Sequence, residues 1–305
     1  MKNVHLLMLM LMLMPLPARA QVIDVATARA ILFEADAKVT TAALVCVDGN
    51  EEAQIECLIG ARFASDLRAS RVARDLYLCT GTVSGLLPEQ DFDGDYRGQL
   101  HFVPHLPVKA DRHHLEGVAA ALLDFEAFFQ DIQRDGKIHY RWRALDLRYF
   151  RSVKRRTPSA YATGWTVAYN VSGSLFTTPA RTRETLFHEV FHLNDFDHDG
   201  WSSRALSAIY DRIVAKCGMK IACLKPYTPD SIIVRGGTYY AFMPDNGVNE
   251  YGADLAKRYY VEHRALMNQK KITKPFKCLT PDNAQAWQLL VDEFFGGVDR
   301  VPACR

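Results

Sequence analysis

The sequence predicts an α+β fold. Long stretches carry apolar residues at helical spacing, shorter stretches are rich in β-formers, and helical stretches both precede and follow the strands. Of the 305 residues, 49% are hydrophobic and 24% are charged, an ordinary balance for a globular chain of this length. We therefore expect a large hydrophobic core.

Residues 1–20 have the layout of a secretory signal peptide. Lys2 gives a positive start, residues 6–14 are an unbroken run of Leu and Met, and residues 18–20 form a small-residue cleavage site. The run is too short for a stable transmembrane helix, although a short membrane anchor is the alternative. We expect a secreted or periplasmic protein with no membrane span in its mature chain.

The charge of the remaining chain argues against two kinds of partner. Residues 1–20 contain two of the 37 basic residues and none of the 35 acidic ones, so the mature chain is balanced. A net charge near zero argues against binding to nucleic acid or to a charged membrane surface.

A helical, cysteine-containing region is expected over residues 21–100. Residues 22–45 and 58–78 read as helices with apolar faces, and the second is bracketed by Cys57 and Cys79. The Gly- and Asp-rich stretch from 81 to 98 reads as a junction loop.

The second expected domain covers residues 101–305. Residues 115–134 form a strongly periodic helix, the alternating residues 138–142 and the β-formers of 165–176 read as strands, and helices are expected over 181–194, 203–216 and 248–267. This order of helix, strands and helices supports the α+β prediction.

Seven cysteines fit an exported protein with disulfide bonds. Pairing between neighbours would give Cys46–Cys57, Cys217–Cys223 and Cys278–Cys304 and would leave Cys79 over, although spacing alone cannot fix connectivity. No CxxC pair occurs, so a thiolate metal site is not expected.

A metal-binding motif lies in the expected helix 181–194. The sequence His188-Glu189-Val190-Phe191-His192 reads HExxH, and helical spacing places both His side chains on one face, where they can bind one Zn²⁺ ion. Glu189 lies beside them and can accept a proton from a water molecule as the catalytic base. The alternative is a helix with two structural His residues.

A catalytic zinc site needs a third protein ligand, and Glu250 is our preferred candidate. Glu250 and Asp254 stand four residues apart in the expected helix 248–267 and therefore face the same way. This pattern resembles the gluzincins, whose HExxH helix is completed by a Glu from an ExxxD helix, and it is also similar to the zinc-Glu helix of the CAAX-protease-type zincins. The resemblance covers residues 180–265. It implies a zincin-like metallopeptidase domain, with Glu250 as ligand and Asp254 holding a ligand His by its second ring nitrogen.

The competing third ligand is His198. It stands where the metzincin pattern HExxHxxGxxH places its third His, although Asp195 replaces the glycine of that pattern. Under this alternative the chain would be a metzincin-like peptidase.

The turn after the motif reads DxDxDG, like the start of an EF-hand loop. Asp195, Asp197 and Asp199 could bind Ca²⁺, with Gly200 at the sharp turn. Position twelve holds Leu206 in place of the bidentate Glu, so an ordinary acidic turn is the alternative.

Two further features would complete a peptidase site. Tyr240, or its neighbour Tyr239, could stabilise the oxyanion of the tetrahedral intermediate. The resemblance to zincins implies that the strand 165–176 is an edge strand that pairs with an extended substrate. We expect a secreted zinc metallopeptidase acting on a peptide or protein. The alternatives are an inactive secreted zinc-binding protein and a disulfide-containing protein whose motif is accidental.

Overall fold

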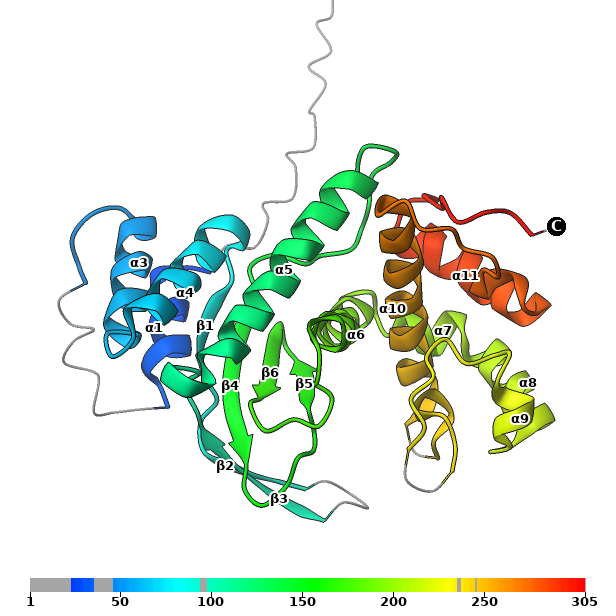
Figure 1. The fold of residues 1–305 in the computed structure, drawn as a ribbon, viewed down its shortest axis with the longest axis horizontal. Helices are drawn as coiled ribbons and strands as arrows, with labels where there is room; N and C mark the ends of the chain where they lie inside the picture. Colours follow the sequence, from blue (N-terminus) through cyan, green and yellow to red (C-terminus); the bar gives the residue numbers. More distant parts are fainter. Residues whose placement is uncertain (1–22, 36–45, 94–97, 235–236, 245, 305) are drawn as a thin grey trace, which may run out of the picture.

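The computed structural model describes residues 23–35, 46–93, 98–234, 237–244 and 246–304 (Figure 1). The expected signal peptide lies outside the described residues. The fold is α+β, as predicted. The α-helices are α1 (Val25–Phe33), α3 (Glu51–Arg62), α4 (Leu67–Thr80), α5 (Arg112–Ile132), α6 (Pro179–Asp197), α7 (Trp201–Ala205), α8 (Ser207–Cys217), α9 (Ile221–Leu224), α10 (Gly247–Met267) and α11 (Pro281–Phe294).

The described strands form one mixed sheet around β4. They are β1 (Val83–Leu86), β2 (Gln90–Asp93), β3 (Gln99–Pro104), β4 (Asp146–Ser152), β5 (Ala160–Thr163) and β6 (Thr166–Asn170). On one side of β4, β1 pairs in parallel with its first half and β3 pairs antiparallel with its second half. On the other side, β6 pairs with β4 in parallel, and β5 pairs antiparallel with β6 as the last strand in that direction.

The helices divide between the two ends of this sheet (Figure 1). Helices α1, α3 and α4 lie beside β1, and α5 crosses between them and α6. Helix α6 packs against both β5 and α10, which connects the sheet to the C-terminal helices. None of the described helices is long and apolar enough to cross a membrane.

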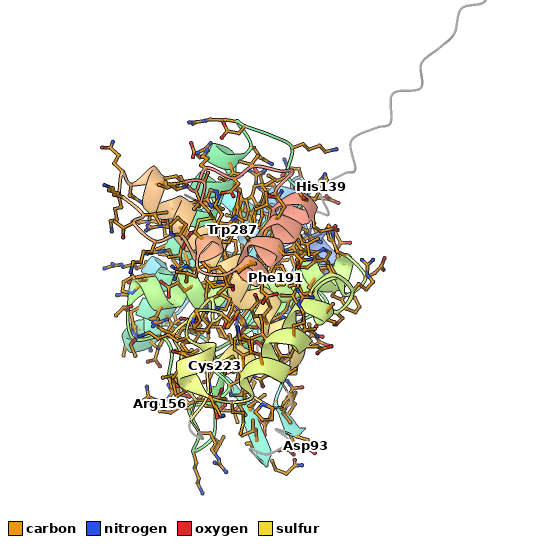
Figure 2. The ribbon with its side chains drawn as sticks, turned by 90° about the vertical axis from the view of Figure 1, so that its right-hand side faces the viewer. Asp93, His139, Arg156, Phe191, Cys223 and Trp287 are labelled. Carbon is orange, nitrogen blue, oxygen red and sulfur yellow. A yellow bond between two sulfur atoms is a disulfide. The ribbon has the colours of Figure 1, made fainter. Side chains whose placement is uncertain are left out.

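Aromatic side chains fill the core where α5, α6 and α10 meet. Phe187 of α6 is fully buried, and its ring lies 4.6 Å from that of Tyr260 and 5.3 Å from that of Phe125, measured between centroids. In the side view of Figure 2, Phe191 of α6 and Trp287 of α11 lie near the middle of the molecule, and both are buried. The buried face of α6 thus fixes the helix that carries the HExxH motif.

The β5–β6 hairpin is tied to the end of α6. Its two turn residues, Gly164 and Trp165, both have positive φ, as a type I′ turn requires. The Trp165 indole N–H donates to Asp197 at 2.9 Å, and the guanidinium of Arg141 stacks 3.6 Å from the centre of the indole ring. The strand at the end of the sheet therefore has a fixed position relative to α6.

The N-terminal region contains more elements than predicted. The first predicted helix, 22–45, is shorter: α1 ends at Phe33, and residues 36–45 lie outside the described residues. The predicted helix 58–78 is two helices, because Asp66 starts α4 by accepting hydrogen bonds from the backbone N–H groups of Arg68 and Ala69. The expected junction loop contains β1 and β2, and the expected boundary at residue 100 falls inside β3 of the same sheet.

Both strands predicted in the second region differ from the structure. Residues 138–142 are not a strand, because their backbone N–H groups bond elsewhere: His139 donates to the carbonyl of Phe294, and Arg141 donates to the Asn194 side chain. The strand predicted over 165–176 is shorter, ends at Asn170, and lies between β4 and β5. The prediction that this strand lies at the edge of the sheet is therefore wrong, because β5 is the edge strand.

The predicted helix 203–216 is two helices, α7 and α8, which meet at Leu206. Helix α11 was not predicted. Thr280 caps its N-terminus and Pro281 occupies its first turn.

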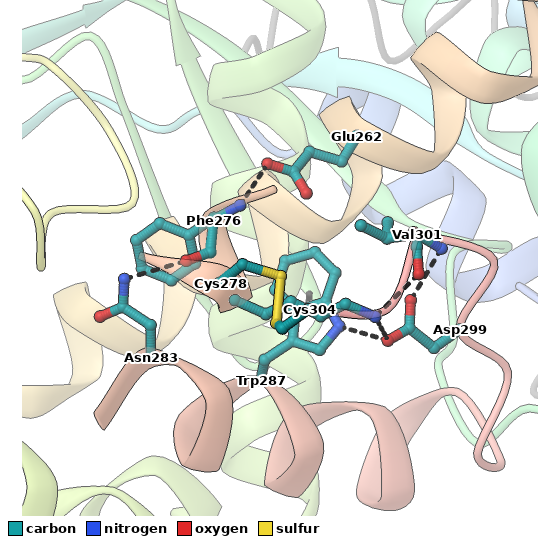
Figure 3. Close-up of a disulfide and its surroundings, with 9 residues drawn as sticks. Glu262, Phe276, Cys278, Asn283, Trp287, Asp299, Val301 and Cys304 are labelled. Carbon is teal, nitrogen blue, oxygen red and sulfur yellow. Dashed lines mark hydrogen bonds and ion pairs between the residues drawn. A yellow bond between two sulfur atoms is a disulfide. The ribbon is translucent and has the colours of Figure 1, made fainter. Parts of the chain in front are cut away.

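The disulfides follow the pairing of neighbours, which the sequence left open: Cys46–Cys57, Cys217–Cys223 and Cys278–Cys304, with Cys79 free and exposed. The Cys278–Cys304 bond lies beside a polar cluster that holds the C-terminal segment (Figure 3). In this cluster Asp299 accepts hydrogen bonds from the Trp287 indole and from Lys277.

Candidate metal centre

Helix α6 presents the two His residues of the motif toward α10. Thr178 caps its N-terminus by accepting a hydrogen bond from the Arg181 N–H, and Pro179 occupies the first turn. One turn separates His188 from His192, so both rings leave the same face of the helix. Only 7% of the His188 surface is exposed.

Glu250 of α10 completes a group of three ligands. His188 Nε2 lies 2.8 Å from Glu250 Oε2 and 3.1 Å from His192 Nε2, and His192 Nε2 lies 3.5 Å from Glu250 Oε2. A tetrahedral zinc site with bonds of 2.0–2.1 Å has ligand atoms about 3.3 Å apart. The three distances are close to that value, so the group can hold a metal ion with little movement.

The second ring nitrogen of His188 is held from behind. Its Nδ1 lies 3.0 Å from Asp254 Oδ1, which leaves Nε2 directed at Glu250 and His192. Lys257 donates to the same Asp254 oxygen at 2.6 Å and to Asp230 at 2.5 Å. This buried chain of charges connects α10 to the segment before Ser231 and fixes the orientation of the His188 ring.

The charges around the group favour a cation. Burial alone would lower the pKa of His188, but hydrogen bonds with Asp254 and Glu250 outweigh burial and raise the pKa to about 10. Burial acts to raise the pKa of Glu250, yet hydrogen bonds with the two His rings hold that pKa well below its usual range. Carboxylates that stabilise a proton on an imidazole would also stabilise a divalent cation bound between the same side chains.

Glu189 points to a cleft beside the ligand group. The cleft has a volume of about 690 Å³ and runs from the edge strand β5 to the start of α10. Its lining includes His188, Glu189, His192, Glu250, Tyr161, Phe196, Tyr240 and Asn249. Burial raises the pKa of Glu189, so this carboxylate accepts a proton more readily than an exposed one.

Of the two candidate tyrosines, Tyr240 lies in the cleft. Its ring centre is 6.1 Å from that of His188. Tyr239 is buried and does not line the cleft. Of these two tyrosines, Tyr240 is the one that could contact a molecule bound in the cleft.

His198 does not join the ligand group. Its Nδ1 lies 2.6 Å from Glu293 of α11, and the only group of three or more close metal-binding side chains in the described part of the chain is His188, His192 and Glu250. The geometry thus favours Glu250 over the metzincin-like alternative.

The acidic residues at the C-terminal end of α6 and in the turn that follows do not form a convergent calcium site. Asp195 accepts hydrogen bonds from the backbone N–H and the hydroxyl of Ser202, while Asp197 accepts from Trp165. These carboxylates have separate partners, and among the described residues they are not part of a group that could share an ion. The turn instead connects α6 to α7.

Three contributors to the site were not identified from the sequence. Lys257 follows Asp254 by three residues on one helix, which is a weak signal, and Asp230 gives none because it lies distant along the chain. The edge strand β5 was missed because it is only four residues long.

Comparison of the chain with protein-family models, with curated proteins and with solved structures finds no match. The assignment of the site therefore depends on its own geometry and chemistry.

Proposed function

We propose that the chain is an exported zinc-dependent metallopeptidase with a zincin-like catalytic region. The observation that carries this proposal is the convergence of His188, His192 and Glu250 beside Glu189, in a cleft. Two imidazoles and one carboxylate with an open side toward the cleft are the ligands of a catalytic zinc site. Three disulfides agree with an oxidising compartment outside the cytoplasm.

In this proposal a bound zinc ion would polarise the scissile carbonyl and make the attacking water more acidic. Glu189 accepts the proton of that water and later delivers it to the leaving amine. Tyr240 donates a hydrogen bond to the carbonyl oxygen as negative charge develops on it. Asp254 and Lys257 take no proton and hold the His188 ring in place.

The proposal is tested by metal analysis combined with peptide digestion. The purified protein should contain one equivalent of zinc and should cleave members of a complex peptide mixture, read by mass spectrometry. Glu189→Gln should keep its zinc and its fold but lose turnover by about 100-fold or more, because the amide cannot accept the proton. Glu184→Gln is the matched control on the same helix and should retain activity.

Two ligand variants separate the alternatives. Glu250→Ala should lose zinc, whereas His198→Ala should keep it. The opposite pattern would support the metzincin-like alternative. Bound zinc with no cleavage of any peptide would indicate an inactive zinc-binding protein, and a wild-type protein that binds no zinc would reject the proposal.

A further inference from the structure

A second, smaller cavity adjoins the cleft on the other side of Glu189. Its volume is about 180 Å³, and it shares Pro158, Ala160, His188, Glu189 and Tyr240 with the cleft. The remaining walls come from the loops before β5 and after β6, from α6, from α10 and from the residues before Tyr239; they include Leu175, Thr185, Ile232 and Val234. The cavity therefore opens next to the side chains that the proposed reaction uses.

The size of this cavity fits one side chain. An apolar cavity of about 150 Å³ is known to hold a benzene molecule, so about 180 Å³ can hold the side chain of Leu, Met or Phe and cannot hold two such groups. Successive residues of an extended peptide stand about 3.3–3.6 Å apart. A side chain that reaches a cavity beside Glu189 and His188 therefore belongs to a residue adjoining the cleaved bond.

The walls of the cavity carry no unmatched positive charge. Leu175, Ile232 and Val234 provide apolar surface. Lys257 is the one cation in the lining apart from His188, and its ammonium group is neutralised by Asp230 and Asp254. An acidic substrate side chain in this cavity would be repelled by Asp254 and Glu189. A basic side chain would lose its hydration and gain no ion pair, because Asp254 is already paired and Glu189 is required by the proposed reaction.

We infer that this cavity is the specificity pocket of the enzyme, and that the substrate class is peptides with an uncharged apolar residue of Leu, Met or Phe size next to the cleaved bond. This inference rests on the proposed peptidase function. The selected group is the side chain of one substrate residue, and the walls of the cavity select it. Thr185 is the wall residue chosen for the test, because it lies on α6 one turn before Glu189 and is buried.

The test compares cleavage by the wild type and by variants that fill the pocket. Wild-type cleavage sites, mapped by mass spectrometry, should be enriched in Leu, Met or Phe at one position adjoining the bond. Thr185→Leu should reduce kcat/KM for such peptides by about 10- to 200-fold, the usual effect of losing an apolar pocket contact, and should shift the preference to Gly or Ala. Thr185→Val, which keeps the size, should retain the preference.

One control and one further variant accompany this test. Thr273→Leu makes the same chemical change at an exposed position outside both cavities and should leave the cleavage pattern unchanged. Val234→Phe narrows the pocket from its partly exposed wall, so it tests the same inference if Thr185→Leu does not fold. Zinc content and melting temperature are measured for each variant.

A binding measurement separates failure of this inference from failure of the proposed function. Labelled peptides with Leu or Asp at the selected position are titrated into the zinc-loaded Glu189→Gln protein, and the Leu peptide should bind more tightly by about 10-fold or more. If the cleavage preference and peptide affinity are the same in the wild type, Thr185→Leu and Val234→Phe, the assignment of the pocket is wrong, but the proposed peptidase function still stands. A wild-type protein that neither cleaves nor binds any peptide would overturn both.

Discussion

At the scale of single residues, Asp254 connects the ligand group to the rest of the protein. It accepts a hydrogen bond from His188 and forms an ion pair with Lys257 through the same oxygen. Partners of metal-binding His residues orient the ring and select its tautomer. In the proposed metal site, the side chain of Asp254 would therefore contribute to metal affinity without touching the metal.

We predict that Asp254→Ala weakens zinc binding by about 10- to 100-fold, because the His188 ring loses its acceptor. Competition with a coloured zinc chelator measures this change. Asp124→Ala is the control: Asp124 binds Arg264 and Tyr260 of α10 away from the ligand group, so this variant should lower stability and leave zinc affinity unaltered. Equal zinc affinities for the wild type and Asp254→Ala would contradict the positioning role.

A second residue-scale prediction concerns acid stability. Hydrogen bonds from the backbone N–H groups of Lys109 and Ala69, together with the Arg112 guanidinium, lower the pKa of Asp66 to about 2. The unfolded chain has a pKa of about 3.9 at this position. The folded-state pKa is depressed, so the contribution of Asp66 to stability is complete above about pH 4 and is lost as the pH falls toward 2.

Urea unfolding between pH 5 and pH 2 measures this contribution. Asp66→Asn should be less stable than the wild type at pH 5, and the difference should shrink as the pH approaches 2. Asp75→Asn, at an exposed position on the same helix, is expected to follow the wild-type curve. A constant difference between wild type and Asp66→Asn across this range would show that the carboxylate charge is not the cause.

Sequence reasoning worked best for residues that act within one helix. The spacing of His188 and His192, and of Glu250 and Asp254, determines which side chains share a face, and these faces do meet in the structure. Lys257 and Asp230 were missed because their partnership depends on how the segment before Ser231 folds back onto α10. No helical or strand period encodes that contact.

At the scale of elements, the approach of α10 to α6 and α7 depends on Gly252. A Cβ atom at this position would lie 2.9 Å from the Ser202 Cβ and 3.3 Å from the Phe191 ring. Ser202 cannot move easily, because it holds Asp195 at the end of α6. Glu250 lies half a turn away, so any displacement of α10 would also move a ligand.

We predict that Gly252→Ala is destabilising despite the higher helix propensity of Ala. The clash costs about 1–3 kcal/mol, which exceeds the gain of about 1 kcal/mol from propensity. Zinc affinity should fall as well. Gly117→Ala on α5 is the matched control, since its nearest neighbour would lie 3.9 Å away, and it should be neutral or stabilising. A Gly252→Ala protein with unaltered stability and zinc affinity would contradict this account.

The predictions failed for segments whose backbone groups form hydrogen bonds with residues distant in the sequence. Residues 138–142 have strand-like alternation, but their alternating side chains are buried against helices and their N–H groups bond to Phe294 and Asn194. Strand β1 was taken for a loop because its four residues include Ser84 and Gly85. Gly85 is required there, since a Cβ would lie 1.9 Å from the Ile31 carbonyl oxygen.

At the scale of the whole molecule, the proposed metal would connect two long helices that are distant in sequence. Two ligands come from α6 and the third from α10. A ligand that binds only the folded state raises stability by about 2.7 kcal/mol at a free concentration one hundred times its dissociation constant. The metal should therefore stabilise the whole fold and not only the site.

We predict that a chelator lowers the melting temperature by several degrees and that added zinc restores it. Glu250→Ala should melt at a temperature that neither the chelator nor zinc changes. Calcium should not replace zinc, because two of the three ligands are imidazole nitrogens and Ca²⁺ prefers oxygen ligands. The carboxylates of Asp195 and Asp197 offer no second calcium site, since they have separate partners. Scanning calorimetry of wild type and variant measures all of these effects, and a wild-type melting temperature indifferent to zinc would argue against a metal that joins the helices.

The order of helices and strands was sufficient to predict the α+β class, but it could not predict the sheet. Strand β4 pairs with strands that come before it in the chain, β1 and β3, and with one that comes after it, β6. Such non-local pairing depends on the whole fold and leaves little trace in local sequence.

The place of β1 and β2 in the sheet has a consequence for activation. Many secreted proteases are held inactive by an N-terminal segment that is later cut away, and residues 21–100 would be the natural segment to remove. Here that removal would take β1 from the side of β4 and would delete Phe92, which lines the cleft. It would also expose an unpaired strand edge, which favours aggregation. We therefore expect that loss of this whole region would not activate the proposed peptidase, and that a protein trimmed at residue 101 would be insoluble.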